Sequence, residues 1–327
     1  MILLLGATGL LGHNVLEMLL RHGYRVRCVV REGSVIDGAV LSAASEGQLQ
    51  IITGSILDDS VLEKSISGCN AVVNCTGVTD MGLSRLDDYR PVNAELPLRL
   101  ARILDDYSGG VLVNISSANT VDPGTSGNPS NEDTPFGGPF TGSLYARSKR
   151  EGEKALTDFA EKHLRTRVVI LLPGFIIGPY DRKPSSGKLL MTAYKEPVMS
   201  VPPGGKSFTD ARDVASAVLG ALSNPLARGR YLTTGKSLSL KEFYSLQASV
   251  CNYRQLCFVL PRRLCLWVGR IGDWLESHGR KVLFTSRNVR QLLVEECYDS
   301  SRAHKELGMT ATPLEQSIKD FFDYVAR

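Results

Sequence analysis

The chain has 327 residues, 43% of them apolar and 22% charged, enough for one large globular domain and a smaller one. The net charge of +4 is spread without basic runs. Composition therefore argues neither for nor against nucleic acid, and we predict no nucleic-acid partner. No apolar run approaches the ~20 residues of a membrane span.

Cysteine and histidine usage gives two further expectations. The seven cysteines include no C-x-x-C pair, and no signal peptide is evident. This favours reduced thiols and a cytoplasmic location. The five histidines lack metal-ligand spacing, so we predict no metal site.

The first twenty residues predict a strand, a sharp turn and a helix. Residues 1–5 are apolar, Gly6, Gly9 and Gly12 follow at intervals of three, and an amphipathic run continues to residue 20. The first glycine permits the turn, the second admits a pyrophosphate and the third allows close helix–strand packing. A helix N-terminus also favours phosphate. We therefore predict a dinucleotide site rather than a merely structural turn.

Four more strands are predicted before residue 118, over residues 24–31, 50–58, 71–77 and 110–117, with a helix over about 91–104. Strands alternating with helices indicate a parallel, doubly wound sheet of Rossmann type. Arg31 ends the second strand, where an arginine pairs with a 2′-phosphate and an acid would accept from a free 2′-hydroxyl. A solvated strand-end arginine is the equally weighted alternative. Asp58 ends the third strand, where it would receive the adenine amino group.

The next segments carry the candidate chemistry. Residues 119–143 read as a loop over the strand ends, and a helix over 144–162 precedes a strand over 167–172. Tyr145 and Lys149 are four residues apart and share a helix face. A nearby lysine and an oxidised nicotinamide would lower the tyrosine pKa toward neutrality, and Ser117 would hold the substrate oxygen. These three form a plausible acid–base set for hydride transfer to a carbonyl.

Beyond residue 173 the pattern loosens. Residues 183–203 look loop-like, a helix is predicted over 211–222 and a strand over 229–234. A stripe within residues 264–275 predicts a helix packed on its neighbours, with lipid or a hydrophobic substrate as the sharper alternative. We assign residues 1–172 and about 209–235 to the dinucleotide domain. Residues 173–208 and 236–327 would form a smaller, mostly helical substrate region.

Several motifs together resemble an extended short-chain dehydrogenase/reductase. They are Gly6–Gly12, Asn93 within PVNA, Ser116-Ser117-Ala118, Tyr145 to Lys149, LPGFIIGP at 172–179, FTDARDVA at 208–215 and YDSSRA at 298–303. The chain is most similar to the dihydroflavonol-4-reductase and 3β-hydroxysteroid dehydrogenase branch of the NAD-dependent epimerase/dehydratase family.

The resemblance implies roles for individual residues. Tyr145 would be the general acid, Lys149 its electrostatic partner and a ribose ligand, and Ser117 the carbonyl-orienting donor. Arg31 would bind the 2′-phosphate, which indicates NADP(H), with NAD(H) less favoured. The remaining cofactor contacts implied are Gly6, Thr8, Gly9, Leu10, Leu11, Gly12, Leu57, Asp58, Thr76, Gly77, Asn93, Pro173, Phe175 and Ile176.

Three functions are weighed. The first is an NADP(H)-dependent reductase of a small, hydrophobic ketone or aldehyde. The second is an NAD-dependent nucleotide-sugar epimerase or dehydratase, disfavoured by Arg31 but left open by Arg182, Lys183 and Lys188. A non-catalytic dinucleotide sensor ranks third, because both Tyr145 and Lys149 are present. The apolar pocket is expected from residues 175–177, from Leu189, Leu190, Met191 and Tyr194, and from the 264–275 stripe. A homodimer is left open, and substrate identity is not readable.

Overall fold

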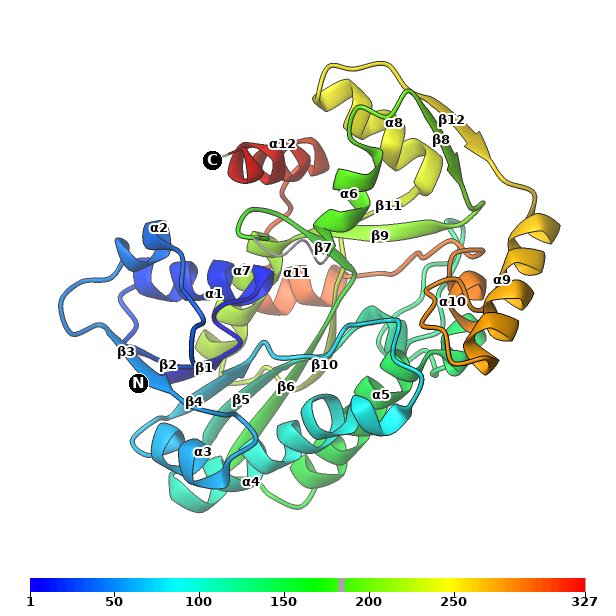
Figure 1. Ribbon diagram of the computed structural model, residues 1–327. Helices are drawn as coiled ribbons and strands as arrows, with labels where there is room; N and C mark the ends of the chain where they lie inside the picture. Colours follow the sequence, from blue (N-terminus) through cyan, green and yellow to red (C-terminus); the bar gives the residue numbers. More distant parts are fainter. Residues whose placement is uncertain (182–185, 327) are drawn as a thin grey trace.

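A computed structural model describes residues 1–181 and 186–326 (Figure 1). Its main feature is a parallel seven-stranded sheet of order β10-β6-β5-β4-β1-β2-β3. The order reverses between β1 and β4, where doubly wound sheets bind ligands. This confirms the predicted Rossmann-type sheet. Its strands are β1 (Ile2–Leu5), β2 (Val26–Val30), β3 (Leu49–Thr53), β4 (Ala71–Asn74), β5 (Gly110–Ile115), β6 (Thr166–Pro173) and β10 (Gly229–Thr233).

Helices cover both faces of this sheet (Figure 1). Leu3, Leu4 and Leu5 are all fully buried, and alternation along β1 sends Leu4 to one core and its two neighbours to the other. A strand that is apolar at every position therefore needs a helical layer on each side. One layer holds α1 (Leu10–Arg21), α2 (Gly38–Leu41), α7 (Ala211–Ser223) and α11 (Ser301–Leu307), and the other holds α3 (Asp59–Ile66), α4 (Leu96–Tyr107) and α5 (Leu144–Ala160).

The second region is smaller and has its own core, in which Phe208 stacks on Phe243 with ring centroids 4.0 Å apart. It is mostly helical, as predicted, and also contains two small sheets. Its three-stranded sheet is β7 (Phe175–Ile177), β9 (Gly205–Asp210) and β11 (Lys236–Ser239), and its two-stranded sheet is β8 (Val198–Val201) and β12 (Leu256–Val259). Its helices are α6 (Gly187–Ala193), α8 (Leu240–Val250), α9 (Arg262–Ser277), α10 (Ser286–Gln291) and α12 (Leu314–Val325).

Three expectations differ from the structure. The predicted loop over 183–203 is wrong over α6 and β8, because β8 is stabilised by parallel pairing with β12, nearly sixty residues later. The predicted third strand is too long: β3 ends at Thr53, and Asp58 is instead the N-cap of α3, its carboxylate accepting from the Ser60 N–H at 2.9 Å. The segment around α11 also returns to the large sheet, so the substrate region does not take all of 236–327.

Four short helical turns lie in the segments at the carboxyl edge of the sheet. Three are 3-10 turns: η1 (Leu86–Asp88), η3 (Ala118–Thr120) and η4 (Gly138–Gly142). The fourth, η2 (Pro91–Glu95), is a π-helical turn that leads directly into α4. Within the described ranges, no helix is both long and apolar enough to cross a bilayer.

We predict that Gly12→Ala strongly destabilises the fold. A Cβ at residue 12 would lie 1.9 Å from the Gly6 carbonyl oxygen and 2.9 Å from the Ala7 Cα, so backbone would have to move. A loss of at least about 3 kcal/mol in the free energy of unfolding is expected, measured by urea denaturation without cofactor. Gly38→Ala is the matched control, because a Cβ there meets nothing within 4 Å and should be neutral or stabilising. Equal stability of the two variants would contradict the packing argument.

Candidate active site

The glycine turn is built as its spacing predicts. Gly6 leaves β1 with φ +81°, a conformation that favours glycine, and the Gly9 N–H donates to its carbonyl at 3.0 Å. Helix α1 then begins at Leu10, with Gly9 as an N-cap that offers no side-chain cap and with no acid in the first turn. The first N–H groups of α1 therefore remain available to an anion.

The exposure of the residues in this turn indicates which of them could contact a cofactor through a side chain and which only through the backbone. Gly9 is exposed, while Thr8 and Leu10 are half-buried at its rim. Leu11 is buried in the core, so any contact it makes with a cofactor would come from its N–H group. The predicted phosphate contacts of these residues stay predictions.

Tyr145 and Ser117 meet at the carboxyl edge of the sheet. Ser117 follows β5, and Tyr145 lies in the first turn of α5, whose N-cap is Ser143. Burial raises the pKa of Tyr145, while hydrogen bonding with Ser117 lowers it and the charge of Glu153 raises it. The structure thus brings together the predicted acid and the predicted orienting hydroxyl.

Lys149 lies one turn after Tyr145 and is almost fully buried. Its ammonium donates to the Ile115 carbonyl at 2.9 Å and to the Thr76 carbonyl at 3.3 Å. Burial lowers its pKa to about 8, opposed by the negative charge of Glu153. The lysine therefore ties α5 to the ends of β5 and β4, the strands beside the switch point.

Thr76, Gly77 and Asn93 form the wall opposite α5. A Cβ on Gly77 would lie 3.1 Å from the Lys149 ammonium, so any larger residue would press the lysine away from its carbonyl partners. Asn93, in the π-helical turn, accepts from the Val78 N–H at 2.9 Å and donates to the Ser148 hydroxyl at 3.0 Å. Its amide thus holds the segment after β4 against α5. The predicted cofactor contact of Asn93 stays a prediction beside this positioning role.

A buried carboxylate below the lysine was missed by the sequence analysis. Glu153 lies four residues after Lys149 on the same helix, and it accepts a hydrogen bond from Ser116, the neighbour of Ser117. It pairs with Arg230 at 3.1 Å and with Arg150 at 3.2 Å. The spacing of 145, 149 and 153 was the available signal, since it puts all three on one helix face.

The predicted adenosine contacts lie at the other side of the switch point. Arg31 directly follows β2, is exposed, and has no carboxylate partner among the described residues. Leu57 is exposed on the segment before α3. Asp58 is exposed too, and hydrogen bonds with Ser60 lower its pKa. The Asp58 carboxylate therefore already serves α3 as a cap, whatever it offers to adenine.

The nicotinamide-side residues follow β6. Pro173 ends that strand and is buried, while Phe175 and Ile176 in β7 are half-buried. Phe175 packs edge-on against Phe208, with ring centroids 5.6 Å apart. These residues join the large sheet to the second core.

The expected apolar pocket lining is only partly available. Ile177 and Leu190 are core residues of the second region, and Tyr194 stacks on Phe322. Leu189 is half-buried and Met191 is exposed. The prediction that the 264–275 helix packs its stripe on neighbours is wrong for Leu264 and Trp267, which are exposed. Arg182 and Lys183 lie outside the described residues.

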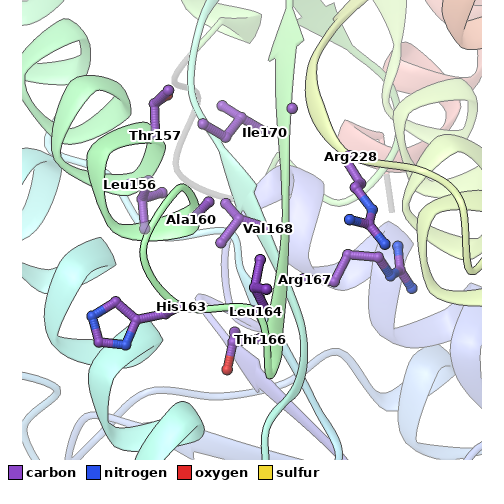
Figure 2. Close-up of a pocket in the computed structure, with 11 residues that line it drawn as sticks. Leu156, Thr157, Ala160, His163, Leu164, Thr166, Arg167, Val168, Ile170 and Arg228 are labelled. Carbon is purple, nitrogen blue, oxygen red and sulfur yellow. The ribbon is translucent and has the colours of Figure 1, made fainter.

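A shallow pocket at the opposite edge of the sheet is separate from this site. Figure 2 shows Thr166 and Arg167, at the amino end of β6, among its lining residues, with Leu156 and Ala160 of α5. Its walls are mostly apolar, and Arg167 already donates to the carbonyls of Ala221 and Ala227. It contains none of the predicted site residues. Nowhere in residues 1–181 and 186–326 do His, Cys, Asp or Glu side chains gather in threes as a metal site would require.

The doubly wound sheet, with a glycine turn at its switch point, defines an extended short-chain dehydrogenase/reductase. The chain belongs to the NAD dependent epimerase/dehydratase family, whose model matches residues 2–232. Family membership identifies a nicotinamide dinucleotide as the cofactor class, and the first-turn N–H groups of α1 suit its pyrophosphate.

Similar proteins span the whole chain. One is the sterol demethylase protein B of Methylococcus capsulatus, 26% identical over 97% of this chain and 96% of that protein. Another is a putative dihydroflavonol 4-reductase of Synechocystis, 24% identical over 96% and 91%. The crystal structure of gox2253 superposes with a TM-score of 0.83 at 20% identity, covering 99% of this chain and 97% of that one.

We predict that Lys149 makes stability rise with pH. Its folded pKa of about 8 lies below the ordinary 10.5, so between these values the unfolded chain binds the extra proton. The free energy of unfolding of the wild type, relative to Lys149→Met, should therefore rise by roughly 2–3 kcal/mol from pH 8 toward pH 10.5. Urea unfolding across this range measures it.

The exposed Lys154 on the same helix supplies the control. The free energy of unfolding of Lys154→Met should differ from that of the wild type by the same amount throughout this pH range. If the difference between the wild type and Lys149→Met is also independent of pH, the lowered pKa of the buried Lys149 ammonium is contradicted.

Proposed function

We propose that this chain is an NADP(H)-dependent reductase that converts a carbonyl of a small hydrophobic substrate into an alcohol. The observation that carries the proposal is the meeting of the Ser117 hydroxyl with the Tyr145 phenol, one helical turn from the Lys149 ammonium. Two hydroxyls and a cation at the carboxyl edge suit a reaction in which negative charge develops on oxygen.

The chain's residues supply orientation and the proton. The reduced cofactor, when bound, supplies the hydride. Ser117 and Tyr145 would both donate hydrogen bonds to the carbonyl oxygen, which polarises it and fixes its position. Tyr145 would then transfer its phenolic proton to that oxygen, a step worth about 10²–10⁴ in rate. The positive charge of Lys149 would stabilise the resulting phenolate.

Arg31 supports NADP(H) over NAD(H) in this proposal. Its side chain is exposed directly after β2 and has no carboxylate partner among the described residues. A 2′-phosphate at this position would gain charge-assisted hydrogen bonds from the guanidinium. With NAD(H), the same side chain would have only a neutral hydroxyl to meet.

A reductase is supported over an epimerase by the cations near β9. A sugar nucleotide needs free cations for its diphosphate. Lys206 is instead paired with the buried Glu296, and Arg212 with Asp210 at 2.8 Å and Asp320 at 2.5 Å. Relatives named as reductases, among them dihydroflavonol 4-reductase and cinnamoyl-CoA reductase, support a hydrophobic carbonyl.

We predict that Tyr145→Phe abolishes carbonyl reduction and leaves cofactor affinity nearly unchanged. The ring remains, and only the proton donor is lost, so kcat should fall by about 10²–10⁴. The measurement is NADPH oxidation against a panel of aromatic and alicyclic carbonyls, with cofactor binding titrated by fluorescence.

Tyr24→Phe is the matched control, since its hydroxyl lies 3.4 Å from Ser223 on the helix layer away from α5. It should keep full activity. UDP-, GDP- and dTDP-sugars are tested in parallel for epimerisation. Turnover confined to those sugars would replace the reductase with the epimerase, and substantial activity in Tyr145→Phe would overturn the acid assignment.

We predict that Arg31→Ala shifts the cofactor preference toward NADH by about ten- to hundredfold, because each charge-assisted hydrogen bond contributes roughly 1.5–3 kcal/mol. Dissociation constants of NADPH and NADH measure the shift. Arg25→Ala, an exposed arginine just before the other end of β2, should leave the ratio unchanged. Equal or tighter binding of NADH by the wild type would rule out the 2′-phosphate role.

A further inference from the structure

Helix α9 turns its largest apolar side chains outward. Trp267 and Trp274 are each 60% exposed, although tryptophan is usually well buried. In Figure 1 the helix lies at the periphery of the molecule, at the end of the β12 chain segment. Exposed apolar side chains also line the adjoining segments: Leu256, Phe258 and Val259 in β12, Leu264 in α9, and Leu283 and Phe284 in the following turn. We call α9 and these residues the α9 surface.

The packing of α9 explains why this face points outward. The buried side of the helix consists of Cys265, Gly269 and Gly272. A Cβ on Gly272 would lie 2.2 Å from the Phe284 carbonyl oxygen, and one on Gly269 would lie 3.0 Å from the Ser286 Cα. The helix thus rests on backbone through its glycines, and the core beneath it is small. The two tryptophans are therefore not part of the buried side by which α9 packs on the protein.

Charge around the α9 surface has one dominant sign. Four cations on α9 and the turn after it are exposed and have no carboxylate partner among the described residues: Arg263, Arg270, Arg280 and Lys281. The two acids of α9, the exposed Asp273 and the half-buried Glu276, both have partners. Asp273 accepts from the Ser286 N–H at 2.8 Å, and Glu276 pairs with Arg287. The outward face therefore combines bulky apolar groups with arginine.

We propose that the α9 surface docks onto an anionic lipid bilayer, with the helix lying in the interface. Tryptophan suits the headgroup boundary, because it is apolar with one polar N–H. Unpaired cations beside it gain energy from anionic headgroups. Positions 263, 267, 270 and 274 recur every three or four residues, so both kinds of side chain share one face. A second copy of this chain would bring the same cations together, which disfavours self-association.

Helix α10, which packs against α9, joins the α9 surface to the candidate active site. Asn288 donates to the Met81 carbonyl at 3.0 Å, and Arg287 donates to the Leu83 carbonyl at 3.2 Å. Residues 81 and 83 follow the Thr76–Gly77 wall, so a docked bilayer would lie beside the loops that border Tyr145. The docking proposal itself does not depend on the reductase function.

Intrinsic fluorescence tests the proposal directly, because Trp267 and Trp274 are the only tryptophans in the sequence. The full-length wild-type protein is titrated with vesicles of phosphatidylglycerol and phosphatidylcholine, and separately with phosphatidylcholine alone. We expect a blue shift and co-sedimentation with the anionic vesicles, weakened by salt. No shift and no sedimentation with anionic vesicles would overturn the proposal.

Variants locate the contact. Arg263→Glu with Arg270→Glu should reduce partitioning onto anionic vesicles by more than about tenfold. Trp267→Ser with Trp274→Ser should abolish co-sedimentation. The control pair is Leu164→Ser with Leu226→Ser, two exposed leucines remote from α9, which should bind like the wild type. Circular dichroism checks that each variant is folded.

Two outcomes would contradict the bilayer as the occupant. Loss of binding in the leucine control equal to that in the tryptophan pair would place the contact elsewhere. A blue shift that grows with protein concentration in the absence of vesicles, together with a dimer in light scattering, would assign the surface to a second copy of the chain.

Discussion

The close approach of two backbone segments at the switch point is the constraint on which the site depends. A Cβ at Gly6 would lie 2.8 Å from the Cys75 carbonyl carbon, so β1 and β4 can end side by side only if residue 6 is glycine. In the same turn, Gly12 of α1 packs directly against the Gly6 carbonyl. One tight contact therefore sets where the α1 N-terminus points and how far Thr76 lies from it. The N–H groups of α1 that are predicted to meet the pyrophosphate are therefore placed by main-chain contacts.

Lys149 shows how the site works against stability. An ammonium almost wholly removed from water is destabilising, and its lowered pKa is the sign of that penalty. Two carbonyls at the ends of β4 and β5 offset part of it, and Glu153 supplies a balancing charge one turn below. Glu153 is itself held by Arg230 from β10, across the sheet. Such a chain of charges anchors α5 rigidly at the turns that carry Tyr145 and Lys149, and the fold accepts a local cost for it.

How much the sequence could predict depended on whether the deciding contacts were local. The glycine turn and the Tyr145–Lys149 pair were readable because each lies within one turn of chain. The end of β3 was not, since Gly54 lies against Val61 and the chain turns there to let Asp58 cap α3. Strand β8 depends on pairing with β12, which no local pattern reveals. For α9 the periodicity was visible, but the sequence did not reveal that Gly269 and Gly272 form the buried side of the helix.

Two segments beside α5 are held by contacts from later in the chain. Ile177 and Leu190 are committed to the second core, whereas the turns η1, η3 and η4 that pack on α5 belong to residues 78–89 and 118–143. In the segment 118–143, Gly124 forms a β-bridge with Cys297, and Ser130 forms one with Tyr298. Arg230 also donates a hydrogen bond to the Glu132 carbonyl at 2.6 Å. The segment 78–89 is held by Asn288 and Arg287 of α10, which donate to the carbonyls of Met81 and Leu83. Contacts from the C-terminal third of the chain therefore fix both segments that lie beside α5.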